Sequence, residues 1–143
     1  MTMMTRTAAA VALAMTATQA LASTVTVVVR GVRSDAGEIG CALFSSGDGF
    51  PMKTGKATMQ WHAARREGVS CRFENVRPGT YAVAVSHDLN GNRRTDTNFV
   101  GIPREDWGVS RGARPSLRAP RFDEASFTVA GDAPQQITVT VAR

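Results

Sequence analysis

The sequence predicts an all-β protein, folded as an antiparallel β-sandwich with one long polar loop. Three observations predict it: several short runs in which apolar and polar residues alternate, turn-forming residues between those runs, and no long stretch with the period of a helix. The strands should be six or seven in number.

The first strands are expected near the start of the mature chain. Residues 24–32 (TVTVVVRGV) alternate and are rich in β-branched side chains, and residues 38–44 (EIGCALF) follow a short turn, so the pair is expected to form a hairpin. Residues 52–61 have a weak pattern, which predicts a short helix or an irregular crossover with Trp61 buried.

Four further strands are expected at residues 68–73, 80–86, 125–129 and 136–141. The alternation in these runs predicts which side chains face the core. The predicted core is Val27, Val29, Ile39, Leu43, Phe73, Tyr81, Val83, Val85, Phe127, Val129, Ile137 and Val139.

The first 22 residues have the features of a secretory signal peptide. Arg6 supplies a positive charge, residues 8–17 form a short apolar stretch, and Ala20-Leu21-Ala22 matches a cleavage site. We therefore expect a periplasmic or secreted protein whose mature part, residues 23–143, is a single sandwich domain. An uncleaved N-terminal membrane anchor is the alternative; residues 8–17 are too short for a stable membrane span, and no second apolar segment follows.

Without Arg6, the 17 basic and 12 acidic residues leave a net charge of +4. Seven arginines fall between Arg93 and Arg121, against four acidic residues from Asp88 to Asp106. A solvated, Arg-rich surface explains this pattern, and an anionic cell-envelope partner is the alternative. No motif for binding nucleic acid is present.

Cys41 and Cys71 each lie within an alternating run, so both side chains should face the core. In an exported chain such a pair predicts a disulfide, with Cα atoms about 5.5–6 Å apart. Two free, buried thiols are the alternative.

The polar loop from His87 to Ser110 follows a predicted buried strand. Asp88, Asn90, Asn92 and Asp96 occupy positions 1, 3, 5 and 9 of a Ca²⁺-loop spacing, which predicts a Ca²⁺ site within residues 88–98. The pattern departs from a standard loop, because Arg93 replaces the glycine at position 6 and Phe99 the glutamate at position 12. Asn98, Glu105 and Asp106 are nearby sources of further oxygen ligands. A loop held only by Asx-turns would have the same residues.

His87, Asp88 and Asn98 are also the candidate ligand-binding residues. His87 is interpreted as an orienting residue that hydrogen-bonds the loop, and catalysis would require His62 or another titratable group beside it. Phe99 and Trp107 are expected to pin the loop to the sandwich.

Three segments together resemble the DUF2141 family of exported bacterial proteins. They are GEIGCALFSSGDGFP, CRFENVRPGTYAVAVSHDLNGNRRTDTNFVGIPREDWGVS and APRFDEASF, and the resemblance covers about residues 24–142. It implies an immunoglobulin-like or transthyretin-like sandwich and no particular activity.

Two functions from different classes follow. The first is an exported, non-enzymatic binding or accessory domain with a Ca²⁺-binding loop, and we expect this one. The alternative is a small transthyretin-like hydrolase or isomerase that uses His87 and Asp88, which rests on analogy of fold.

Overall fold

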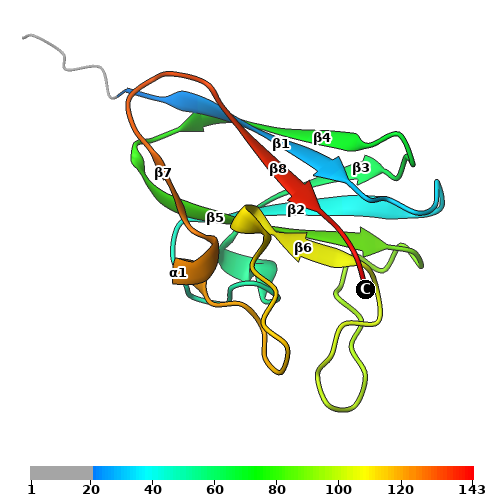
Figure 1. Ribbon diagram of the computed structural model, residues 1–143. Helices are drawn as coiled ribbons and strands as arrows, with labels where there is room; N and C mark the ends of the chain where they lie inside the picture. Colours follow the sequence, from blue (N-terminus) through cyan, green and yellow to red (C-terminus); the bar gives the residue numbers. More distant parts are fainter. Residues whose placement is uncertain (1–20) are drawn as a thin grey trace, which may run out of the picture.

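The computed structural model describes residues 21–143 and shows two packed β-sheets (Figure 1). The first sheet contains β4 (Val69–Val76), β1 (Ser23–Arg30) and β8 (Gln135–Thr140) in that order. The second contains β3 (Thr58–Ala63), β2 (Glu38–Phe44), β5 (Gly79–Asp88) and β6 (Trp107–Val109), and β7 (Phe127–Val129) pairs with the start of β5. The predicted sandwich is therefore confirmed.

Helical structure in residues 21–143 is limited to three short segments, η1 (Thr54–Lys56), η2 (Ser110–Gly112) and α1 (Phe122–Ala125). Within residues 21–143, none of these is long or apolar enough to cross a membrane. Nearly all of the predicted signal peptide, residues 1–20, lies outside the described residues.

The predicted hairpin between the first two strands is wrong. β1 pairs antiparallel with β4 and parallel with β8, whereas β2 pairs with β3 and β5 in the other sheet. The connection between β1 and β2 crosses from one sheet to the other and contains two glycines with positive φ. A Cβ on Gly31 would lie 2.6 Å from the carbonyl oxygen of Val141, and one on Gly37 would lie 2.1 Å from that of Asp88. Both positions therefore require glycine.

Two strands were not predicted. β3 is an edge strand in which no side chain is fully buried, so it has no clear alternation. β6 has only three residues and lies inside the segment that was expected to be an irregular loop. The predicted helix or crossover over residues 52–61 is thus only η1, followed by β3. Trp61, expected to be buried, is half-buried on β3 and lies over Gly40.

The core lies between the two sheets and agrees with the alternation in the sequence. Nine of the predicted core residues are buried, whereas Tyr81, Phe127 and Ile137 are only partly buried against the core. Phe127 and Ile137 belong to the short strand β7 and to the edge strand β8, where one side of the sheet has no neighbour.

The disulfide between Cys41 and Cys71 is confirmed, and both residues are fully buried. Their Cα atoms are 6.4 Å apart, slightly more than predicted. Because Cys41 lies on β2 and Cys71 on β4, the bond joins the two sheets directly.

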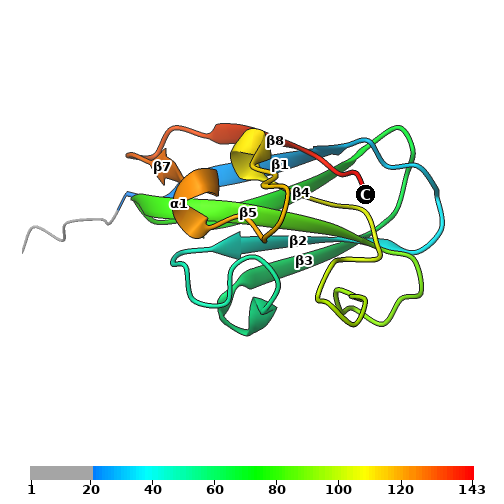
Figure 2. The same ribbon diagram turned by 60° about the horizontal axis from the view of Figure 1, so that its bottom comes forward.

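The outer face of the second sheet is also partly covered by protein. Small and aromatic side chains form a second buried cluster there: Ala42, Phe44, Ala82, Ala84, Val109 and Ala125. Phe50 and Phe122 pack against this cluster from the segments that precede η1 and form α1 (Figure 2).

Glu124 fastens the segment before α1. Its carboxylate accepts hydrogen bonds from both terminal nitrogens of Arg118, at 2.8 and 2.7 Å, and from the backbone N–H of Arg121, at 2.8 Å. These contacts, led by the hydrogen bonds from Arg118, lower the pKa of Glu124 from 4.5 to about 2.

Removal of the disulfide is expected to destabilise the sandwich. The Cys41→Ala, Cys71→Ala double variant should lose roughly 3–4 kcal/mol of unfolding free energy, because the bond closes a loop of about thirty residues in the unfolded chain. Urea unfolding of the variant and wild type measures this difference. Titration of denatured, unreduced wild type should find no free thiol, and two reactive thiols would contradict the bond.

Glu124→Gln should lower the melting temperature at pH 7. Because the pKa of Glu124 is lowered, its carboxylate contributes its full stabilisation at pH values above the ordinary pKa of 4.5. This stabilisation is lost as the pH falls towards 2. The difference between variant and wild type should therefore shrink to nothing near pH 2. The exposed control Glu67→Gln should leave melting unchanged, and a pH-independent difference for Glu124→Gln would count against this account.

Candidate functional site

The candidate site is the loop of residues 89–106, which connects β5 to β6. Its outer half is a small hairpin, in which the N–H of Arg104 donates to the carbonyl of Asp96 (2.8 Å) and the N–H of Asn98 donates to that of Ile102 (2.9 Å). Its base lies beside the Asp88 end of β5 (Figure 1). The loop thus has a defined backbone although little of it is regular secondary structure.

Asp88 is fully buried at the end of β5. Its Oδ1 accepts the N–H of Gly91 at 2.9 Å, and its Oδ2 accepts the N–H of Arg93. Gly91 and Arg93 both have positive φ, 71° and 56°. Because a buried carboxylate is costly unless it accepts hydrogen bonds, these two donors fix the first turn of the loop around Asp88.

The side chains of Asn90, Asn92 and Asp96, also predicted as ligands, contact one another. The side-chain amide of Asn90 donates to Asp96 Oδ2 at 2.7 Å, and the amide of Asn92 donates to both Asp96 oxygens at 3.0 and 3.1 Å. The Oδ1 atoms of Asn90 and Asn92 accept backbone N–H groups two residues on, from Asn92 and Arg94, and so form Asx-turns.

Glu105, near the end of the loop, is only 6% exposed. Its Oε1 accepts the N–H of Leu89 at 3.1 Å, whereas its Oε2 is buried and has no hydrogen-bond partner among the described residues. Burial raises the pKa of Glu105, and the nearby charges of Asp88 and Asp96 raise it further. Three carboxylates therefore lie close enough for their charges to interact.

Arginines tie the loop to the rest of the protein. Arg93 pairs with Glu38 on β2 through two 3.0 Å hydrogen bonds, which lower the pKa of Glu38, and its guanidinium packs over Trp61. Arg33 makes two hydrogen bonds to the buried Asp106 and lowers the pKa of that carboxyl. The guanidinium of Arg93 makes its hydrogen bonds to Glu38, and its charge also acts on Asp88, whereas Arg33 pairs with Asp106.

His87 is buried beside the loop and donates from Nε2 to the carbonyl of Ala36 at 2.7 Å. His87 and His62 both pair with Ile39, on opposite sides of β2, so their backbones lie two strand spacings apart, about 10 Å. Neither His87 nor Asp88 lines the cavity of about 700 Å³ on the outer face of the second sheet. His62 is therefore not brought to His87 and Asp88, whereas Asp106 lies close enough to His87 for their charges to interact.

Asn98 and Phe99 lie at the tip of the hairpin, away from Asp88. The Oδ1 of Asn98 accepts the N–H groups of Val100 and Ile102, both at 3.0 Å, so this side chain caps the hairpin turn. Phe99 is 99% exposed, and the expectation that it pins the loop is wrong. Trp107 is half-buried on β6 and packs against the outer cluster.

In the part of the chain that the structure describes, no three His, Cys, Asp or Glu side chains are arranged as a ready metal site. Ca²⁺ sites, however, combine carboxylates with amide, backbone carbonyl and water oxygens. Sequence spacing placed Asp88, Asn90, Asn92 and Asp96 in this loop but could not rank Glu105 above Asn98 and Asp106 as an additional oxygen source.

Asp88→Ala should destabilise the protein even without any ligand. Two hydrogen bonds to a charged acceptor are lost, at about 1.5 kcal/mol each, so unfolding free energy should fall by about 3 kcal/mol. Urea unfolding measures this change. Asp132→Ala, at an exposed turn, serves as the control and should stay within about 0.5 kcal/mol of wild type. Equal, small effects of both changes would show that Asp88 does not organise the loop.

Comparison with known proteins identifies the family. A family model described as "Uncharacterized protein conserved in bacteria (DUF2141)" matches residues 27–138. No curated protein and no solved structure matches the chain. Because the family match spans most of the sequence, this protein belongs to the DUF2141 family.

Proposed function

We propose that this protein is an exported, non-enzymatic binding domain whose loop of residues 88–105 binds Ca²⁺. The carboxylates of Asp88, Asp96 and Glu105 supply the charge, and the amide oxygens of Asn90 and Asn92 and backbone carbonyls supply further ligands. All of these are hard oxygens, which suit Ca²⁺ better than a transition metal.

The observation that carries the proposal is the buried Oε2 of Glu105, which has no hydrogen-bond partner within 3.5 Å among the described residues. Burial and the charges of Asp88 and Asp96 raise the pKa of this carboxyl, and the backbone N–H of Asp96 lowers it. A buried acceptor without a donor is costly, and buried like charges add to that cost. A divalent cation at this point would give Oε2 a partner and would offset the charge of all three groups.

The rest of the loop is compatible with that role. Asp88 holds the first turn by accepting backbone N–H groups, and the Asx-turns of Asn90 and Asn92 bring their amides next to Asp96. Binding requires the two amides to rotate, so that oxygen replaces nitrogen on the side that faces Asp96, and this rotation gives up the Asx-turn hydrogen bonds that the same oxygens accept. With basic residues adjacent, the expected Kd is about 10⁻⁴–10⁻³ M. Such affinity suits a periplasmic or extracellular compartment, in agreement with the signal peptide that we propose.

An anionic cell-envelope partner of the Arg-rich segment has less support than Ca²⁺ binding. Arg93 and Arg118 are paired with Glu38 and Glu124, so much of the positive charge is already matched within the protein.

Ca²⁺ should raise the melting temperature of the wild type. At a concentration about ten times the Kd, mass action stabilises the fold by about 1.4 kcal/mol. For a domain of this size, that corresponds to a rise of roughly 3–8 °C. Asp88→Ala and Asp96→Ala should each abolish the rise.

Glu105→Gln distinguishes a cation site from a hydrogen-bonded scaffold. The amide oxygen still accepts the N–H of Leu89, but the charge that repels Asp88 and Asp96 is removed, so the variant should be at least as stable as wild type without Ca²⁺ and should not respond to Ca²⁺. Glu67→Gln, at an exposed site elsewhere, should keep the full response. If millimolar Ca²⁺ leaves wild-type melting unchanged while Asp88→Ala and Asp96→Ala still destabilise, the loop is held by Asx-turns and the proposal fails.

A further inference from the structure

The outer face of the second sheet contains a cavity of about 700 Å³. Its floor is formed by small residues on the paired strands β2 and β5, namely Ala42 and Ala84. Because these residues have very small side chains, the surface of the sheet is left low between the segments that border it. The volume lies within the range of about 300–1,000 Å³ that is usual for small-molecule sites.

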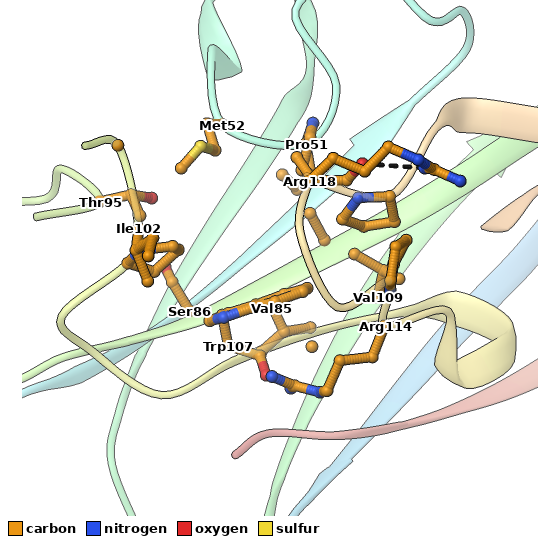
Figure 3. A pocket seen from close by; sticks show the side chains of 18 of the residues that line it. Pro51, Met52, Val85, Ser86, Thr95, Ile102, Trp107, Val109, Arg114 and Arg118 are labelled. Atoms are coloured by element: carbon orange, nitrogen blue, oxygen red, sulfur yellow. Dashed lines mark hydrogen bonds between the residues drawn. The ribbon is translucent and has the colours of Figure 1, made fainter. Parts of the chain in front are cut away.

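Three segments from different parts of the sequence form the walls: residues 51–54, 95–103 and 114–120. Figure 3 shows Pro51 and Met52 at the top, Thr95 and Ile102 at the left, and Val85 and Trp107 below them. Several wall residues are apolar and exposed, including Ile102 at 59% and Leu117 at 98%. Apolar exposure concentrated around one concave, apolar surface indicates a binding site.

The charged side chains that line the cavity are all basic. Arg114, Arg118 and Arg143 line the cavity, and no acidic side chain does. Arg118 is matched by Glu124, and Arg143 lies 4.0 Å from Asp106, which Arg33 already pairs.

Arg114 differs from the other two arginines. Its guanidinium packs over the ring of Trp107, with 4.1 Å to the centroid, and donates to the backbone carbonyls of Trp107 and Ala142. These acceptors are neutral, so the positive charge of Arg114 is not offset by a carboxylate. The cavity therefore combines an apolar surface with one uncompensated cation near Trp107 (Figure 3).

We propose that this groove binds one small anionic amphiphile, a molecule with an apolar chain and a carboxylate or phosphate head. The chain lies on the floor formed by Ala42 and Ala84, against Ile102 and Met52. The head pairs with Arg114, because a guanidinium presents several donors to an oxyanion. This inference does not depend on Ca²⁺ binding.

Dodecanoate, used below its micelle concentration, tests the proposal by isothermal titration calorimetry and by the tryptophan fluorescence of the protein, to which Trp107 contributes together with Trp61. One molecule should bind per chain, and dodecyl phosphate should bind similarly. Dodecyltrimethylammonium, which has the opposite charge, should bind at least tenfold more weakly, a difference of about 1.4 kcal/mol. Arg114→Gln should remove most of the preference for dodecanoate over dodecanol.

Two exposed residues of the same hairpin give a matched pair of variants. Ile102→Asp places a negative charge in the wall and should weaken dodecanoate binding at least tenfold, whereas Phe99→Asp, outside the lining, should leave it unchanged. Both side chains are exposed, so both variants should melt like wild type.

Three outcomes would overturn the proposal. The first is equal binding of the cationic and anionic amphiphiles. The second is binding to phosphatidylglycerol vesicles, lost in Phe99→Asp and Leu117→Asp, without any binding of monomeric dodecanoate, which would identify a membrane-contacting surface. The third is a dimer in sedimentation that does not bind dodecanoate, which would mean that a second copy of the chain covers the groove.

Discussion

The buried carboxylate of Asp88 is the contact on which the long loop depends. Burial of this group is tolerable because the N–H groups of Gly91 and Arg93 donate to it, and these bonds turn the chain back directly after β5. The turn brings Arg93 to Glu38 on β2 and places Asn90 and Asn92 beside Asp96. Asp96 in turn fixes the outer hairpin through its carbonyl, which accepts from Arg104.

The same loop contributes to two different surfaces. Its inner part gathers Asp88, Asp96 and Glu105, and its hairpin, residues 95–103, forms a wall of the groove. The two surfaces have opposite charge, since the groove is bordered by arginines and the inner part of the loop is acidic. A cation bound to the inner part would reduce the motion of the whole loop, including the hairpin that forms one wall of the groove. The two proposals are linked in this way, but each has its own experiment.

Alternation in the sequence predicted most of the fold, because a strand with one buried face must place apolar residues at every second position. It predicted the core residues and the inward-facing cysteines. It did not predict which strands are neighbours, since the face of a side chain does not determine its strand's partner, and so β1 and β2 were wrongly paired. The strands β3 and β6 were missed because one is an exposed edge and the other has three residues.

The sequence also predicted only part of the candidate site. The spacing of Asp88, Asn90, Asn92 and Asp96 located the loop, because short-range turns are encoded by neighbouring residues. Glu105 could be singled out only from the structure. It lies far along the chain from Asp88, and what distinguishes it is a buried Oε2 atom with no hydrogen-bond partner among the described residues. The groove could not be predicted from the sequence, because its floor depends on the small side chains of Ala42 and Ala84 and its walls come from three distant segments.

The central claim, that a cation binds among Asp88, Asp96 and Glu105, is tested most directly by anomalous diffraction from crystals grown with Ca²⁺. The account predicts one strong peak at about 2.3–2.6 Å from carboxylate oxygens of all three residues, with the amide oxygens of Asn90 and Asn92 turned towards it. Well-diffracting crystals with no peak at this loop, and with both amides still donating to Asp96, would contradict it.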